Sequence, residues 1–507
     1  MAVILIMTGL FLYLCEGTGS WLLKILAIED DSCAAPIGFA LILSLCQLIY
    51  LFPEHHPQGT MMAIAVISFL VLAMAGTATR YVHKEIRKHV LRKENLVILA
   101  AAVIYVLQCR MSEIPSSSLP SGFLRLPLKE LVGEWQVFNG LSEFRYFGTG
   151  LSNAIALRLH LSPIGLNEMT AYGFGLLYVV LSVSMIIRIM KGFHLRNQWL
   201  AFALSAYLIL YGNYLTWDVS MAGRLSTWSS FFMLVSLYIA YLYVRLETEQ
   251  VKYLLIPAFF AGLSCHNGFA LAGIAILSGL MLYHFSIRKA GCFFDFFAFL
   301  TPFVFYLAMQ FATVLRWAMV IFWLWFLQRR RKKQARRWIN RREEWLFNHW
   351  QWILAITPLL FMAASFILVF FTDFSVGYAW YFQDFNSLSG IRDYLLVHSD
   401  PLNIILSIFR WGGIILLFLH ARTPEDDMLK VFMMGMLLVF INPLCTPALV
   451  AVNGTEVYRM YECTFNALTE SVLFLYFYHL CEWNAAGQWI LELTLCAASI
   501  AGALALF

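Results

Sequence analysis

The chain has 507 residues, of which 61% are hydrophobic, 16% aromatic and 13% charged, and its formal net charge is +5. This composition excludes an ordinary soluble domain and predicts an all-α polytopic membrane protein. Because lipid offers the backbone no hydrogen-bond partners, the long and unalternated apolar runs predict helices rather than strands.

The first part of the chain carries four apolar runs before a basic loop. Met1–Cys15 and Trp21–Ile28 are short, whereas Pro36–Phe52 and Met61–Ala78 predict a helical hairpin whose tip lies outside. Met1–Cys15 has neither a basic start nor a small-residue cleavage motif, so we expect it to remain in the mature chain.

Further apolar runs continue to the end of the chain and predict about 15 to 16 transmembrane helices in all. These runs are Asn95–Cys109, Met169–Ile187, Gln198–Tyr211, Ser226–Val244, Tyr253–Ser264, Gly268–Phe285, Gly291–Thr313, Val314–Gln328, Trp350–Phe371, Leu402–His420, Met428–Ile441, Glu462–Leu480 and Gln488–Phe507. The order predicts N-terminal helices with a basic loop in 1–94, a membrane core in 95–480 and a C-terminal helix in 481–507.

Most of the positive charge lies in alternate gaps between these runs. Of 35 Lys and Arg residues, 24 fall in six gaps, which are Arg80–Lys93, Arg188–Arg196, Arg245–Lys252, Arg288–Lys289, Arg329–Arg342 and Arg422–Lys430. The positive-inside rule places these gaps in the cytoplasm and places the loops 110–168, 372–401 and 442–461 outside. Because Lys289 and Arg329 then both face inward, Gly291–Gln328 must cross the membrane twice.

The basic loop 329–345 is interleaved with Trp338 and Trp345. Such a run is open to two interpretations, a nucleic-acid site or a segment resting on anionic lipid. Its juxtamembrane position favours lipid, so we expect membrane lipids and no nucleic acid as partners.

The first large outer loop contains two segments with apolar residues at helical spacing, Leu128–Phe138 and Thr149–His160. They predict short helices lying in the membrane interface. Between or within them lie Glu134, Glu143 and Arg145. A carboxylate near Trp and Arg at a membrane surface can act as a base, because partial desolvation raises its pKa. The alternative is that Glu143 and Arg145 are solvated loop charges.

Other polar residues gather on the same predicted outer face. They are Asp218, Arg224, His266, Tyr458 and Arg459. Asp218, His266 and Arg459 can converge on one outward cavity, although each alone is more typical of a helix cap or loop charge. Arg224 and Arg459 are the candidates for binding a phosphate, since a guanidinium suits bidentate phosphate contact.

Three ionisable residues, Asp295, Arg410 and Glu470, fall inside predicted spans. Intramembrane charges indicate transport or structural pairing. Because a lone charge at the middle of a membrane is costly, we expect Arg410 to pair with Asp295 or Glu470. The sequence contains no Walker A loop and no HExxH motif, and its ten Cys residues lack metal-ligand spacing, so neither a nucleotide cofactor nor a metal is expected.

The motifs LSPIGLNEMTAYG, GLSCHNGF and NPLCTPALVAVNGTEVYRMYE, together with the long outer loop, resemble integral-membrane glycosyltransferases of the GT-C class and their bacterial relatives. The resemblance spans Met111 to Leu480. It implies transfer of a sugar from a polyprenyl-phosphate donor on the outer face, with Glu134, or Glu143 as second choice, as base and Arg459 on the phosphate. The chain lacks the family's paired acidic signature in that loop and its large C-terminal outer domain.

Three functions therefore remain open. The first is transfer of a lipid-linked sugar to an envelope glycan, lipid or protein by a multi-pass protein of the cell membrane, with no cofactor besides the donor. The second is a transporter or flippase of an envelope precursor. The third is a non-catalytic membrane subunit that acts with envelope-assembly proteins.

Overall fold

The computed structural model describes residues 2–46, 57–90, 94–111, 169–211, 225–266, 268–309, 311, 313–371, 401–453, 457, 459–481 and 484–505. Within these ranges the chain is helical and contains no strand. Seven of the described helices are long and apolar enough to cross a membrane, and four shorter apolar helices accompany them. The predicted all-α class is confirmed for the described residues, and the seven apolar helices are consistent with a membrane protein. The number of about 15 to 16 spans stays a prediction.

Much of the predicted outer face lies outside the described residues. The loops 110–168 and 372–401 fall almost wholly there, and so do the interfacial helices predicted at Leu128–Phe138 and Thr149–His160. The loop 442–461 is described except for residues 454–456 and 458. The division of the chain at residues 94 and 480 stays a prediction.

The N-terminal part of the chain folds into four long helices. They are α1 (Ala2–Ile25), α2 (Ala34–Cys46), α3 (Pro57–Val90) and α4 (Glu94–Met111). The two short apolar runs at the start join in the single helix α1, although Glu16, Gly17 and Gly19 interrupt the apolar pattern. The interruption is tolerated because α2 and α3 pack directly on this part of α1.

Backbones of α1 and α2 lie almost in contact. A Cβ atom added to Gly19 would lie 1.7 Å from the carbonyl oxygen of Ala34, and one added to Gly38 would lie 1.8 Å from that of Cys15. Small residues allow this approach, which is a common way for helices to associate in lipid. The position of α2, and of the loop that precedes it, therefore depends on these two glycines.

The centre of the molecule is formed by helices that are mostly covered by protein. They are η3 (Met169–Gly175), α8 (Leu176–Gly192), α9 (Gln198–Leu210), α11 (Leu225–Leu246), η4 (Val251–Leu254), α12 (Leu255–Cys265) and α13 (Gly268–Ser286). Trp228 of α11 is 1% exposed, and its ring lies 4.7 Å from that of Phe39 in α2 and 5.4 Å from that of Tyr178 in α8. This aromatic cluster joins the N-terminal helices to the centre.

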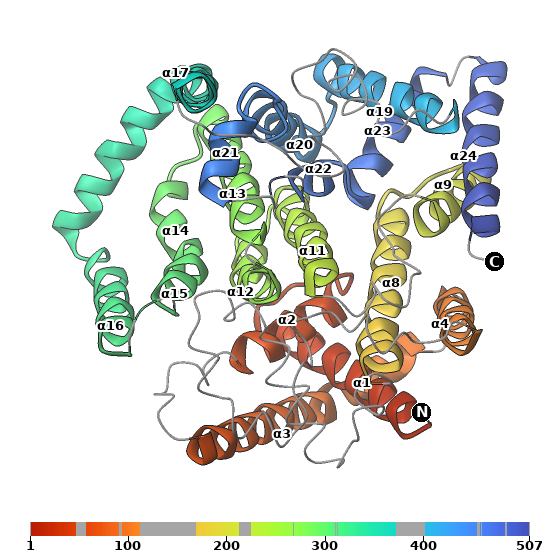
Figure 1. The fold of residues 1–507 in the computed structure, drawn as a ribbon, viewed down its shortest axis with the longest axis horizontal. Coiled ribbons are helices and arrows are strands. Elements are labelled where there is room, and N and C mark those ends of the chain that lie inside the picture. The colour runs from red at the N-terminus through yellow and green to blue at the C-terminus, as the bar shows by residue number, and fades with distance from the viewer. Residues whose placement is uncertain are drawn as a thin grey trace.

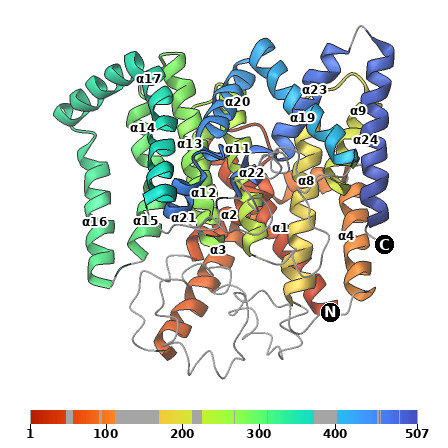
Figure 2. The same cartoon turned by 45° about the horizontal axis from the view of Figure 1, so that its top comes forward.

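The next helices form an arm at the edge of the molecule (Figures 1 and 2). They are α14 (Cys292–Phe299), α15 (Thr301–Met309), α16 (Thr313–Arg329) and α17 (Lys333–Phe371). The stretch 291–328 contains two helical passages, the first formed by α14 and α15 and the second by α16, which packs beside α15. That both cross the membrane stays a prediction. α17 begins far before the predicted Trp350, and its first part lies across one end of the bundle before the helix turns to run along it.

One buried carboxylate fastens α17 to α14. The Glu343 side chain is 4% exposed, and its oxygens accept hydrogen bonds from the backbone N–H groups of Gly291 at 3.0 Å and Phe293 at 3.1 Å. These donors belong to the first turn of α14, which has no partners for them within the helix. The basic part of α17 is therefore held against the bundle.

The described C-terminal part comprises two helices of 20 residues or more and several shorter ones. They are α19 (Pro401–His420), α20 (Pro424–Gly435), η5 (Met436–Phe440), α21 (Thr446–Asn453), α22 (Arg459–Thr464), α23 (Ala467–Leu480) and α24 (Ala485–Ala505), which packs along α9. The predicted single span Glu462–Leu480 is wrong, because the helix breaks at Asn466. The Asn466 side chain accepts hydrogen bonds from two N–H groups of α23, and Thr469 accepts one in return, so a capping box starts a new helix.

Five of the six basic gaps are joined by contacts of residues within them or directly beside them. Lys191 pairs with Glu94 at 2.8 Å, the Arg245 guanidinium donates to the Gly192 carbonyl at 2.6 Å, and Lys289 pairs with Glu249 at 2.7 Å. The Gly291–Glu343 contact adds the fourth link, and the sixth gap opens α20, which packs on α11 and α13. We call this part of the bundle the basic end.

Candidate functional site: a buried charged cluster at helix α22

Six of the eight residues predicted for the site lie outside the described residues. They are Glu134, Glu143, Arg145, Asp218, Arg224 and Tyr458. Their proposed roles, including that of the base, stay predictions. The structure describes the other two, His266 and Arg459.

His266 lies at the corner between α12 and α13 and acts there as a cap. Its backbone N–H donates to the Gly262 carbonyl at 3.2 Å, and its Nδ1 accepts a hydrogen bond from the Gly268 N–H at 3.1 Å. The corner is tight, because a Cβ on Gly262 would fall 2.3 Å from the Phe269 ring. The described contacts thus support the capping interpretation, and convergence with Asp218 lies outside the described residues.

Arg459 is the first residue of α22 and is only 6% exposed. Its guanidinium lies 3.3 Å from a carboxylate oxygen of Glu462 and 3.4 Å from the Ser230 hydroxyl of α11. Ser230 in turn donates a short hydrogen bond to the same carboxylate. The three side chains form one cluster, in which the Glu462 side chain remains 32% exposed.

The cluster lies far from the basic end. Ser230 and Arg245 are 15 residues apart in the same helix α11, which corresponds to about 22 Å along its axis. A buried guanidinium can stabilise a negatively charged leaving group, and an accessible carboxylate can accept a proton. Arg459 and Glu462 therefore bring together the two kinds of group that transfer from a phosphate donor requires.

A second ion pair adjoins α22. Arg410 of α19 pairs with Glu470 of α23, and these side chains are 13% and 1% exposed. The Arg410 guanidinium also donates to the Tyr461 hydroxyl at 2.9 Å and lies 4.7 Å from the centre of the Phe465 ring. The predicted pairing of Arg410 with Glu470 is confirmed.

The helix break at Asn466 explains how Glu470 can carry its charge inside the protein. The break places Glu470 in the first turn of α23, where the unpaired N–H groups and the helix dipole favour an anion. Arg410 supplies the opposite charge from α19. The pair thus stabilises the junction between α22 and α23, close to Arg459.

Asp295, the other possible partner of Arg410, belongs to a separate network near the basic end. It pairs with Lys252, which also contacts Glu249, and Glu249 pairs with Lys289. Partial burial raises the pKa of Glu249, but the hydrogen bonds from Lys252 and Lys289 outweigh burial and hold this pKa at about 2. The pairing of Arg410 with Asp295 is therefore wrong, and Asp295 has a structural partner of its own.

Sequence reasoning missed the partners of Arg459. The spacing of Arg459 and Glu462 in YRMYE was visible, because residues three apart are neighbours on a helix. Nothing in the sequence linked Ser230, more than 200 positions earlier, to this helix. Among the described residues, no group of three or more His, Cys, Asp or Glu side chains is arranged to hold a metal ion.

Comparisons of the chain with protein-family models, with curated proteins and with solved structures gave no match.

Proposed function

We propose that this chain is an integral-membrane transferase that takes a sugar from a polyprenyl-phosphate donor, with Arg459 binding the donor phosphate. The observation that supports this proposal is the cluster of Arg459, Glu462 and Ser230. It holds a buried guanidinium 3.3 Å from a carboxylate oxygen of a partly exposed glutamate. The cluster belongs to the part of the bundle opposite the basic end, which we assign to the outer face of the cell membrane.

Chemistry explains why these groups suit such a donor. Negative charge develops on the phosphate as the sugar leaves, and a guanidinium held away from water stabilises that charge more strongly than one in bulk solvent. The acceptor hydroxyl must lose a proton to a base. We assign the base to Glu134, with Glu143 as second choice, and Glu462 is the carboxylate that the described residues place beside Arg459.

The transport alternative is less well supported by the described residues. Arg410, Asp295 and Glu470 prompted that interpretation, and each of them lies in an ion pair. Pairing is a sufficient structural reason for a charge in a membrane bundle. A non-catalytic subunit remains the alternative outcome of the test below.

The test separates donor binding from transfer. The purified chain in lipid nanodiscs is given a panel of polyprenyl-phosphate sugars, and both donor affinity and sugar transfer are measured for wild type, Arg459→Ala, Glu134→Gln and Glu462→Gln. Arg331→Ala, a change in the exposed basic segment, serves as control. Arg459→Ala should weaken donor binding and transfer together, whereas loss of the base should lower transfer by about 10²–10⁴-fold with donor binding retained.

Each measurement tests a separate part of the proposal, namely the base, the phosphate-binding arginine or the transferase activity itself. Normal transfer by Glu134→Gln would move the base to Glu143 or, if Glu462→Gln fails, to Glu462. Unchanged donor affinity in Arg459→Ala would remove Arg459 from the site. Absence of both binding and transfer in folded wild-type protein would contradict the proposed function and favour the non-catalytic subunit.

A further inference from the structure

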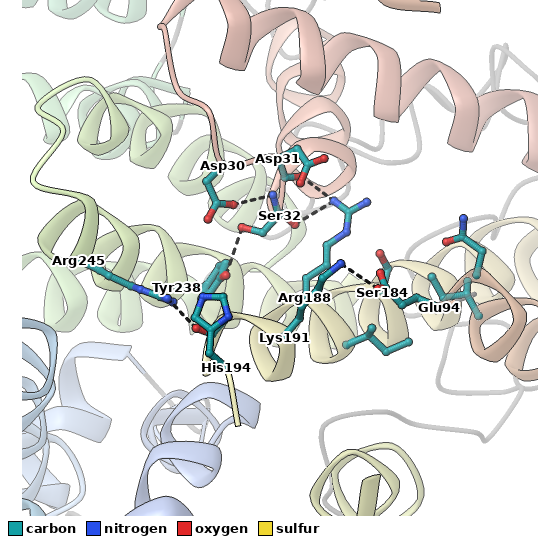
Figure 3. A pocket seen from close by; sticks show the side chains of 14 residues that line it. Asp30, Asp31, Ser32, Glu94, Ser184, Arg188, Lys191, His194, Tyr238 and Arg245 are labelled. Carbon is teal, nitrogen blue, oxygen red and sulfur yellow. Dashed lines mark hydrogen bonds and ion pairs between the residues drawn. The ribbon is translucent and has the colours of Figure 1, made fainter. Parts of the chain in front are cut away.

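A cavity of about 260 Å³ opens at the basic end, away from the α22 cluster (Figure 3). Four segments surround it: the loop between α1 and α2, the start of α4, the end of α8 and the end of α11. It is smaller than the roughly 300–1,000 Å³ of pockets that hold drug-sized ligands. Its size therefore suits a compact polar group rather than a whole sugar-lipid donor.

Among the residues that the structure describes, the charges that line this cavity balance. Three are acidic, Asp30, Asp31 and Glu94, and three are basic, Arg188, Lys191 and Arg245. Figure 3 shows Asp30 and Asp31 on the loop at one side, while the basic side chains reach in from α8 and α11. A cavity with separated charges and no net charge favours neither a simple anion nor a simple cation. It favours a ligand that carries both charges.

The two arginines are held in place mainly by neutral groups. Arg188 donates to the backbone carbonyls of Asp31 at 2.8 Å and Ser32 at 3.0 Å, with a longer contact of 3.4 Å to Glu16. Arg245 donates to the Gly192 carbonyl at 2.6 Å. A carbonyl fixes a guanidinium without cancelling its charge, so both cations can still attract an anion.

The acidic side of the cavity is also fixed in position. An Asp30 carboxylate oxygen accepts a hydrogen bond from the Ser32 N–H at 2.8 Å, and the Tyr238 hydroxyl of α11 donates to the Ser32 hydroxyl at 3.2 Å. The loop is thereby tied to α11 as well as to α8. The cavity is preformed, which lowers the entropy cost of binding.

We infer that this cavity binds a zwitterionic group in which a phosphate ester is joined to a primary ammonium, as in phosphoethanolamine. The phosphate lies toward Arg188 and Arg245, and the ammonium lies toward Asp30 and Asp31. A primary ammonium donates three hydrogen bonds, which carboxylates accept. A quaternary ammonium donates none and is usually bound by several aromatic faces. Within the described part of the chain, Tyr238 is the one Phe, Tyr or Trp that lines this cavity.

Two sources supply this chemistry, the headgroup of phosphatidylethanolamine and a free aminoalkyl phosphate. The inference does not depend on the proposed transferase, because the cavity and the α22 cluster share no residue. Binding is measured on the full chain in detergent, by native mass spectrometry with phosphatidylethanolamine, phosphatidylcholine and phosphatidylglycerol and by calorimetry with O-phosphoethanolamine. Thermal unfolding of every variant reports folding.

Two matched pairs of variants test the assignment. Asp30→Asn keeps an oxygen for the Ser32 N–H but removes the charge, and Glu29→Gln removes the charge of an exposed neighbour that does not line the cavity. Asp30→Asn should lower phosphatidylethanolamine affinity about tenfold, and Glu29→Gln should leave it unchanged. Lys191→Ala should weaken binding about two- to fivefold, and Lys24→Ala, which breaks a similarly exposed pair elsewhere, should not.

Selective retention of phosphatidylethanolamine over the other two lipids, lost in folded Asp30→Asn, supports the inference. Binding of O-phosphoethanolamine with the same dependence on Asp30 identifies a free ligand, and binding of the lipid alone identifies the headgroup. Equal retention of all three lipids without binding of O-phosphoethanolamine overturns the inference. Affinities that Asp30→Asn does not change overturn it as well.

Discussion

Helices α11 and α17 both have the length and apolarity of membrane spans, yet they occupy opposite environments. In α11 the most apolar window has a mean hydropathy of 1.5 and is 83% buried, whereas in α17 the values are 2.5 and 11%. The more apolar helix is the less buried one. Lipid tolerates only apolar side chains, whereas a helix covered by protein can carry polar groups that find partners there.

Both proposed sites take residues from the buried helix. α11 contributes Ser230 to the α22 cluster, and it contributes Tyr238 and Arg245 to the cavity at the basic end. α17 contributes apolar surface and a basic segment fastened by Glu343. The more hydropathic helix α17 is thus the one that we expect to face lipid, and the less hydropathic helix α11 carries residues of both proposed sites.

The largest effect should come from breaking the buried charge pair in the packed region. Arg410→Leu leaves Glu470, which is 1% exposed, without its cation, and should lower the free energy of unfolding by about 3–5 kcal/mol. The double variant Arg410→Leu/Glu470→Leu should recover part of this loss. Thermal or denaturant unfolding in detergent measures both. A double variant no more stable than Arg410→Leu would show that Glu470 is not the partner that matters.

A pair of tryptophans compares the two regions directly. Trp228→Ala removes a 1% exposed ring from the cluster between α2, α8 and α11, and should cost about 3 kcal/mol through the cavity that it leaves. Trp352→Ala in α17 removes a 67% exposed ring and should change stability by less than about 0.5 kcal/mol. Unfolding of the two variants under identical conditions checks the contrast. Equal losses would place α17 against protein rather than lipid.

The smallest effect concerns the network of Glu249, Lys252, Lys289 and Asp295, between the packed region and the arm. The pKa of Glu249 is about 2 in the folded chain, below the 4.5 of an unperturbed Glu. This carboxylate therefore adds stability above pH 4.5, which is lost as the pH falls toward 2. The Glu249 side chain is 48% exposed, so the contribution should stay below about 1 kcal/mol.

The measurement is the unfolding midpoint of wild type and Glu249→Gln between pH 6 and pH 3. Wild type should lose more stability over this range than the variant. Parallel curves for the two proteins would mean that the lysines do not stabilise the Glu249 carboxylate.

Much of the arrangement could be predicted from charge and apolarity. The alternate basic gaps indicated which loops lie together, and contacts such as Lys191–Glu94 and Lys289–Glu249 join them at one end. The cost of an unpaired charge in a membrane also indicated that Arg410 needs a partner. These features depend on residue type alone, and residue type can be read from a sequence.

The remaining features depend on hydrogen bonds whose partners cannot be recognised from residue type in the sequence. Arg188 and Arg245 are bound by backbone carbonyls, which every residue has, so their partners could not be identified. The break at Asn466 falls inside the run that we predicted as the single span Glu462–Leu480. Most of the predicted transferase site, including Glu134 and Glu143, lies outside the described residues and still depends on the resemblance.

The close approach of α1 and α2 influences the shape of the cavity at the basic end, although neither glycine of the contact lines that cavity. Gly19 lies against the carbonyl of Ala34, two residues after Ser32, so the helix contact sets where the acidic loop Asp30–Ser32 stands. Gly19→Leu would push this loop away from Arg188 and Tyr238 without altering any atom of the lining. A residue outside the cavity lining would thus determine the shape of the cavity.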